Sequence, residues 1–288
     1  MRIVHLTDLH VQHLPTLAEL RPKRILGTAN LYLAGRRSHF DPQSQRAAVE
    51  AARALAPDLT IITGDLTAQG LDSEFQSVRS LLEPLAEAAP LYMIPGNHDI
   101  YVDEAEHGAR MRSFLGDWMS PGSPGIAHFG DVSVLYIETC RPTWLSNGST
   151  DTSHLAEAQA LLSDARSFTF LCLHYPLVDR NGQPYGPSRR ANLEAPAVEA
   201  WIHGTTRIQA VLHGHEHHGY RASLPTEYGA IPVLNPGASG YAFLPDQDRT
   251  AHFNVYTVEA NNLIQIERYR WNGQTFTPEP GGAYATGR

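Results

Sequence analysis

Five short segments of the sequence carry residues of the types that bind transition-metal ions. They are Asp8-Leu9-His10, Gly64-Asp65, Gly96-Asn97-His98-Asp99, His174 and Gly214-His215-Glu216-His217. Together they offer two aspartates, one amide oxygen and four imidazoles as ligands, and His98 is left over. Imidazole suits Zn, Cu, Fe and Ni, and carboxylates also suit Mn, while a pair of such ions can clamp an in-line displacement. The set therefore predicts hydrolysis of a phosphate ester by two metal ions.

The spacing of these residues indicates how the ions are held. Two ions roughly 3.5–4 Å apart favour a shared ligand with two acceptor oxygens, and Asp65 is the candidate for that bridge. Asp8 and His10 lie two positions apart, so at a strand end their side chains can converge on one ion.

Each segment follows a stretch that is predicted to be a buried strand. These stretches are residues 3–7, 59–63, 91–94, 168–173 and 208–212. Short apolar runs that alternate with helical patterns predict parallel strands joined by crossover helices. Sites in such sheets form beyond the carboxyl ends of the strands, so the five segments are expected to meet in one place.

The chain at this point resembles the calcineurin-like metallophosphoesterases from Met1 to about Ser239. All five motifs of that family are present in the family's order, and His213 is an extra histidine before the last of them. The resemblance implies a four-layer α/β/β/α sandwich of two packed mixed sheets. It implies a first ion bound by Asp8, His10, Asp65 and His217, and a second ion bound by Asp65, Asn97, His174 and His215.

The same resemblance assigns the chemistry. His98 is expected to face the phosphate, together with Asn97, and to protonate the leaving oxygen or stabilise its charge. Asp99 is predicted to hold the His98 imidazole in one orientation, as carboxylates often do. The attacking group would be a metal-bound hydroxide, without a covalent enzyme intermediate. The ligand set admits Mn, Fe, Zn or Ni as the two divalent ions.

The remaining pattern predicts a layered α/β domain over residues 1–272. Helices are expected at 45–56, 72–88, 105–119 and 153–164, with Pro84 ending or kinking the second. Further strands are expected at 132–138, 231–235, 253–258 and 263–271, with Gly130-Asp131 as a hairpin turn. Residues 273–288, rich in Gly, Pro and Thr, are predicted to be a flexible tail.

Composition favours a soluble enzyme acting on a small phosphoester. The chain has 288 residues, is 42% hydrophobic and carries a net charge of −8, which argues against nucleic-acid binding through a basic face. The N-terminus enters a strand at once and no apolar run is long enough to span a membrane, so we expect a cytoplasmic protein. The single lysine, Lys23, lies in no Walker-type loop, and no Gly-x-Ser-x-Gly elbow occurs.

Two loops are expected to decide the substrate. Segment 14–40 is basic, with Arg21, Lys23, Arg24, Arg36 and Arg37, and it has no acid from residue 21 to 40. It could cap the site, contact anionic lipid, form a partner surface, or simply pack as an insertion on the body. Segment 179–196 carries Arg180, Arg189 and Arg190, whose forks match phosphate oxygens.

The favoured function is a metal-dependent phosphodiesterase that resembles the bacterial class III cyclic-nucleotide phosphodiesterases. The motifs define the metal site rather than the substrate pocket. They therefore leave open a phosphomonoesterase or a lipid-headgroup pyrophosphatase on the same site, as well as the oligomeric state. A non-catalytic metal-binding interaction module is the alternative from another class, and the complete ligand set with His98 argues against it.

Overall fold

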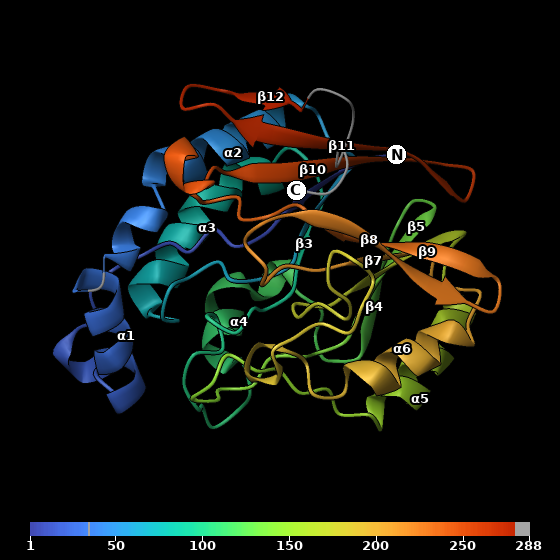
Figure 1. The fold of residues 1–288 in the computed structure, drawn as a ribbon, viewed down its shortest axis with the longest axis horizontal. Coiled ribbons are helices and arrows are strands. Elements are labelled where there is room, and N and C mark those ends of the chain that lie inside the picture. Colours follow the sequence, from blue (N-terminus) through green and yellow to red (C-terminus); the bar gives the residue numbers. More distant parts are fainter. Residues whose placement is uncertain (34, 280–288) are drawn as a thin grey trace.

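Two mixed sheets form the centre of the molecule (Figure 1). The computed structural model describes residues 1–33 and 35–279, and within them each sheet has six strands. The first sheet has the order β12-β11-β10-β1-β2-β3, with β1 Arg2–Leu6, β2 Leu59–Ile62, β3 Leu91–Met93, β10 His252–Glu259, β11 Asn262–Trp271 and β12 Phe276–Pro278. The second has the order β4-β5-β6-β7-β9-β8, with β4 Gly125–Phe129, β5 Val132–Tyr136, β6 Phe168–Cys172, β7 Ala210–Leu212, β8 Tyr220–Thr226 and β9 Gly229–Asn235.

The strands that precede the five motifs are parallel within their sheets. In the first sheet β1 pairs with β2, and β2 with β3, in parallel register, so that Ile3 lies opposite Leu59. In the second sheet β5, β6, β7 and β9 run parallel in the same way. The predicted strands before the motifs are confirmed, and their carboxyl ends lie at one edge of each sheet.

Alternate residues of the central strands pack on opposite sides of each sheet. Ile3 belongs to the apolar core between the sheets, whereas its neighbour Val4 belongs to the core of the first sheet's outer face. Phe170 and Leu171 divide between the two sides of the second sheet in the same way. Both faces of each sheet are therefore covered, as parallel strands require.

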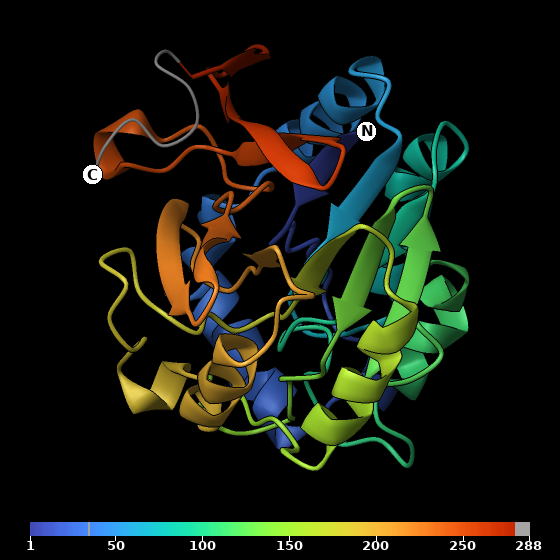
Figure 2. The ribbon, with the colours of Figure 1, turned by 90° about the vertical axis from the view of Figure 1, so that its right-hand side faces the viewer.

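Helices cover the two outer faces. The first sheet is covered by α2 Pro42–Ala54 and α3 Asp72–Ala86, and the second by α5 His154–Leu161 and α6 Ala195–His203. Figures 1 and 2 show α5 and α6 on the same side of the molecule. The predicted four-layer α/β/β/α sandwich is confirmed.

Two further helices lie beside these layers. The helix α4 Ala109–Leu115 buries Met111 and Leu115 in the core that α2 and α3 share. The helix α1 Pro22–Tyr32, from the basic segment 14–40, stands at the periphery of the molecule (Figure 1). Among the described residues, the structure contains no helix with the length and apolar character needed to span a bilayer.

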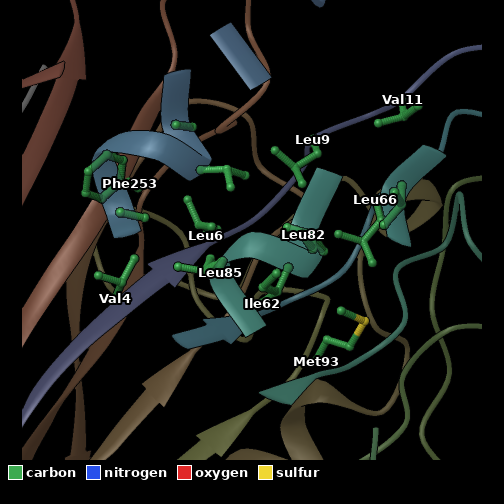
Figure 3. Packing of buried hydrophobic residues seen from close by; sticks show 14 of the residues in the cluster. Val4, Leu6, Leu9, Val11, Ile62, Leu66, Leu82, Leu85, Met93 and Phe253 are labelled. Carbon is green, nitrogen blue, oxygen red and sulfur yellow. The ribbon is translucent and has the colours of Figure 1, made fainter. Parts of the chain in front are cut away.

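The outer core of the first sheet also anchors the first two motifs. Leu9, between Asp8 and His10, is fully buried, and so is Leu66 directly after Asp65. Both belong to the same cluster as the strand residue Leu6 (Figure 3). Because these leucines are fixed by packing, the ligand side chains beside them are held in place rather than carried on mobile loops.

Several sequence predictions were wrong in detail. The helix expected at 105–119 is confined to α4 and a short 3-10 turn after it, and α3 continues through Pro84 to Ala86. The tail prediction fails for β12, which pairs with β11 because Phe276 packs on Trp271. Residues 280–288 of that tail lie outside the described residues. Helix α6 and strand β8 were not predicted.

Candidate metal centre

The predicted ligands meet at the seam between the two sheets. The strand ends of the first sheet supply Asp8, His10, Asp65 and Asn97, and those of the second supply His174, His215 and His217. All seven side chains are at least half-buried. The structure brings together every ligand that the motifs predict, because the carboxyl ends of β1–β3, β6 and β7 face the same space.

The first group contains Asp8, His10, Asp65 and His217, and one ligand atom from each lies within 4.8 Å of the others. The Nε2 atoms of His10 and His217 face each other at 3.2 Å. Asp8 Oδ1 lies 3.4 Å from His217 Nε2 and 3.7 Å from His10 Nε2. Nitrogen and oxygen ligands that converge at these distances surround a point where one cation would fit.

The second group contains Asp65, His174 and His215, and Asn97 lies among them. Asn97 Oδ1 is 3.2 Å from His174 Nε2 and 2.9 Å from His215 Nδ1. Asp65 Oδ1 is 3.4 Å from His174 Nε2. The amide oxygen and the carboxylate oxygen therefore point to the same place as the two imidazoles.

The residues present fit a metal pair. Asp8 Oδ1 is buried and accepts no hydrogen bond among the described residues, which is costly unless a cation pairs with it. The outer nitrogens of two ligands are also fixed: His174 Nδ1 donates to the Thr63 carbonyl at 2.8 Å, and His217 Nδ1 lies 3.0 Å from the Tyr241 hydroxyl. Such outer contacts orient the other ring nitrogen toward a metal.

The ionisation of the site suits cations. Burial opposes ionisation of Asp8, but the neighbouring imidazoles of His10 and His217 hold the pKa of its carboxyl well below the ordinary value. Burial acts on Asp65 in the same way, and the surrounding imidazoles, His174 first, lower its pKa far more than burial raises it. Burial brings the pKa of His215 well below its usual range, so that this imidazole is neutral and able to ligate.

Four ligand residues adopt backbone conformations that residues other than glycine rarely adopt. Asp8, His10, Asp65 and His215 all have positive φ, between 51° and 66°. Such conformations are uncommon outside glycine and gather at functional sites, where the surrounding fold compensates for their strain. The loops also cross closely, since a Cβ on Gly96 would lie 2.1 Å from the backbone nitrogen of Asp65. This close approach leaves no room for a side chain at position 96, which explains why glycine precedes Asn97.

His98 lies beside the first group, with its ring edge-on to His10 at 4.7 Å between centroids. The prediction that Asp99 orients this imidazole is wrong. The Ala68 carbonyl accepts the hydrogen bond of His98 Nδ1 at 2.6 Å. The Asp99 carboxylate is instead engaged by the backbone nitrogens of Leu66, Thr67 and Gly96 and by the Thr67 hydroxyl. Asp99 therefore ties the two ligand loops together rather than orienting the His98 ring.

A cavity of about 650 Å³ opens above the two groups, and Asn97 and His98 line it.

His213, the extra histidine, is fully buried outside both groups, and its Nδ1 bonds the Gly214 carbonyl. Sequence reasoning missed Tyr241 and the Ala68 carbonyl. A tyrosine far from any motif and a backbone oxygen carry no sequence signal of their own.

A sequence model of the calcineurin-like phosphoesterases matches residues 1–219, which include all five motifs. The chain belongs to the calcineurin-like phosphoesterase family. A curated relative, the probable cyclic nucleotide phosphodiesterase of Vesicomyosocius okutanii subsp. Calyptogena okutanii (strain HA), is 24% identical over 210 residues, which are 73% of this chain and 81% of the relative.

Solved structures share the fold of this calcineurin-like phosphoesterase. A dimetal phosphatase from Danio rerio superposes with a TM-score of 0.57 at 12% identity, covering 96% of this chain and 98% of the other. Purple acid phosphatase from yellow lupin (Lupinus luteus) seeds has a TM-score of 0.60 at 15% identity, and the match covers 96% of this chain and 52% of that one. Family members use a dinuclear metal centre, and the two groups described above are the candidate ligands for it here.

Proposed function

We propose that this chain is a dinuclear-metal-dependent phosphodiesterase, with cyclic nucleotides as the first candidate substrates. In the proposal, Asp8, His10, Asp65 and His217 hold one divalent ion, and Asp65, Asn97, His174 and His215 hold the other. His98 acts on the substrate from the edge of this site.

The position of Asp65 carries the proposal. Its Oδ2 lies 3.6 Å from His10 Nε2 in the first group, and its Oδ1 lies 3.4 Å from His174 Nε2 in the second. A carboxylate that turns one oxygen to each group is placed to bridge two ions. When bound, such a pair supplies Lewis acidity, which withdraws electrons from the phosphoryl group and lowers the pKa of an attacking water.

His98 supplies the remaining chemistry. Because its Nδ1 donates to the Ala68 carbonyl, only Nε2 is left to act on a substrate in the cavity. Burial lowers the pKa of His98 to about 4, so the free imidazole is neutral at neutral pH. A bound phosphate anion favours the imidazolium form, which can stabilise or protonate the departing oxygen.

The curated relative supports the choice of a diester. That relative is named as a probable cyclic nucleotide phosphodiesterase, and the aligned region covers most of both chains.

Metal content and turnover should be measured together. Protein stripped with a chelator would be reloaded with Mn, Fe, Zn or Ni and the bound metal counted by mass spectrometry. Each form would then be assayed on bis-p-nitrophenyl phosphate, p-nitrophenyl phosphate, and cyclic AMP and GMP. The proposal expects two ions per chain and metal-dependent cleavage of the diester in preference to the monoester. Preference for the monoester would make the chain a phosphomonoesterase, and two ions without turnover would favour a binding module.

A further inference from the structure

Helix α1 forms part of the wall of the cavity that His98 lines. The role of this wall rests on the phosphodiesterase function proposed above, in which His98 acts on the departing oxygen. The His98 ring lies between His10 and Tyr101, 5.7 Å from the Tyr101 ring centroid. Asn30 and Leu31 of α1 line the same cavity as these rings. The part of a substrate that departs from His98 would therefore rest against this wall.

Helix α1 is a fixed wall rather than a mobile lid. Arg24 is only 2% exposed, and its guanidinium donates to the carbonyls of Gln69 and Gly70 at 3.2 and 2.7 Å. Lys23 Nζ donates to the Tyr101 carbonyl at 2.7 Å. These bonds fasten α1 to the two loops that position His98. The basic residues at the start of α1 are thus used internally and are not available to an outside partner.

The wall leaves polar atoms without partners. Within the described part of the chain, neither Gln69 Nε2 nor Gln12 Oε1 makes a hydrogen bond, although both atoms are buried and both residues line the cavity. An unpaired buried polar atom costs roughly 1–3 kcal/mol. Because both residues line the cavity, this part of its wall is polar.

Positive charge surrounds the cavity. Its lining includes Arg36, Arg189, Arg190 and Arg249, and no carboxylate among the described residues forms an ion pair with them. Arg36 lies on the α1 side, at the start of the 3-10 turn Arg36–His39, where its charge acts on Tyr101. The Glu216 carboxylate also lines the cavity, but it accepts a hydrogen bond from the Tyr185 hydroxyl. The cavity can therefore accept an anion in addition to the scissile phosphate.

An exposed aromatic ring completes the lining. Trp144 is 68% exposed and Leu145 is 59% exposed, yet both line the cavity. Base rings stack on such aromatic faces, a contact worth about 1–3 kcal/mol per base. A ligand that stacks a flat ring on Trp144 and binds Arg36 through an anionic group would be a nucleotide with a second phosphate in addition to the one being cleaved.

We propose that the same cavity also accepts a 5′-phosphorylated dinucleotide as a diester substrate, whose leaving nucleotide places its terminal phosphate on Arg36 while a base stacks on Trp144. Water attacks the internucleotide phosphorus and the bond to O3′ breaks. The departing O3′ takes a proton from His98, and two nucleoside 5′-monophosphates result. A cyclic mononucleotide has no second phosphate and leaves the Arg36 subsite empty.

The test compares adenylyl-adenosine (ApA) with its 5′-phosphorylated form (pApA) on the metal-loaded chain. We expect kcat/KM to be about tenfold higher for pApA, the factor that one charge-assisted contact supplies. Arg36→Ala should bring the ratio of the two values close to one. Arg37→Ala is the matched control, because Arg37 is the adjacent exposed arginine and lies outside the cavity lining, over the Tyr32 ring. Trp144→Ala should raise KM for both dinucleotides.

The two proposals fail differently. If bis-p-nitrophenyl phosphate is not cleaved with any metal, the phosphodiesterase function itself is wrong. If that diester is cleaved but pApA and ApA react equally well, the second anion subsite is refuted. A preference for pApA that survives Arg36→Ala would overturn the assignment of the subsite to Arg36, and an unchanged KM in Trp144→Ala would overturn the stacking of the base.

Discussion

The Nδ1 atom of His98 donates a hydrogen bond of 2.6 Å to the carbonyl oxygen of Ala68. A carbonyl can only accept, so this contact assigns the proton of the neutral ring to Nδ1 and leaves the lone pair of Nε2 toward the cavity. The backbone of one ligand loop thereby orients the imidazole of another. The orientation of His98 therefore depends on how the two loops pack against each other.

Replacing His98 with Ala should separate chemistry from metal binding. We expect two ions per chain to remain and the turnover of cyclic AMP to fall by roughly 10²–10⁴, the range for general acid–base groups. The loss should be smaller on bis-p-nitrophenyl phosphate, because p-nitrophenolate departs readily without a proton. Parallel rate and metal measurements on both substrates check this. An equal loss on the two substrates would contradict proton donation and indicate electrostatic stabilisation alone.

Replacing Asp65 with Asn should weaken both metal sites at once. The substitution removes the negative charge and one of the two acceptor oxygens that face the separate groups. We expect fewer than two ions per chain after dialysis and loss of diesterase activity. Asp164→Asn, an exposed aspartate in the turn after α5, is the matched control and should keep both ions. Retention of two ions in Asp65→Asn would refute the bridge.

Asp99→Asn should destabilise the ligand loops rather than release His98. The carboxylate accepts backbone hydrogen bonds from Thr67 and Gly96, and an amide group can present only one acceptor oxygen to them. We expect a loss of about 1–3 kcal/mol in the free energy of unfolding, measured with urea on metal-free protein. Unchanged stability of the Asp99→Asn variant would contradict this structural role of the carboxylate.

The central strands and the metal ligands could be predicted from the types of residues in the sequence. The apolar runs 168–173 and 59–63 indicated buried central strands, and both are present as β6 and β2. The order of the motifs then predicted that ligands as distant as Asp8 and His217 would meet, which the structure bears out. These inferences succeeded because strand periodicity and ligand chemistry are local properties of the chain.

The parts that were missed depend on tertiary contacts. Phe276 belongs to a strand because it packs on Trp271 and Phe253, and nothing in its Gly- and Pro-rich surroundings indicates that pairing. The orientation of His98 depends on a backbone carbonyl, a group that every residue has. The aspartate after His98 suggested a carboxylate partner, whereas the crossing of the loops at Gly96 draws Asp99 to the backbone instead.

His213 and His217 should respond differently to substitution. His217 Nε2 lies within the first group, 3.4 Å from Asp8 Oδ1, whereas His213 is buried against Tyr220 with its Nδ1 bonded to the Gly214 carbonyl. His217→Ala should lower the metal content, and His213→Ala should keep two ions while reducing stability. Metal counts on the two variants side by side check the assignment. Loss of metal from His213→Ala alone would mean that the wrong histidine has been placed in the site.

The buried His5 should make the fold sensitive to acid. Burial lowers the pKa of His5 to about 3, and its two ring nitrogens contact the Tyr256 and Thr63 hydroxyls at 2.8 and 2.9 Å. The unfolded chain binds a proton near pH 6.5 and the folded chain does not, so stability is lost as the pH falls from about 6.5 toward 3.

Urea unfolding of metal-free protein at pH 7.5, 5.5 and 4.5 measures this contribution. Between the first and last of these values, wild type should lose about 2–3 kcal/mol more than His5→Gln, which has no imidazole to protonate. His203→Gln, at the exposed end of α6, is the matched control and should follow the wild-type curve. Parallel curves for wild type and His5→Gln would show that folding does not lower the pKa of His5. Burial and the contacts with Tyr256 and Thr63 would then not keep the imidazole uncharged in acid.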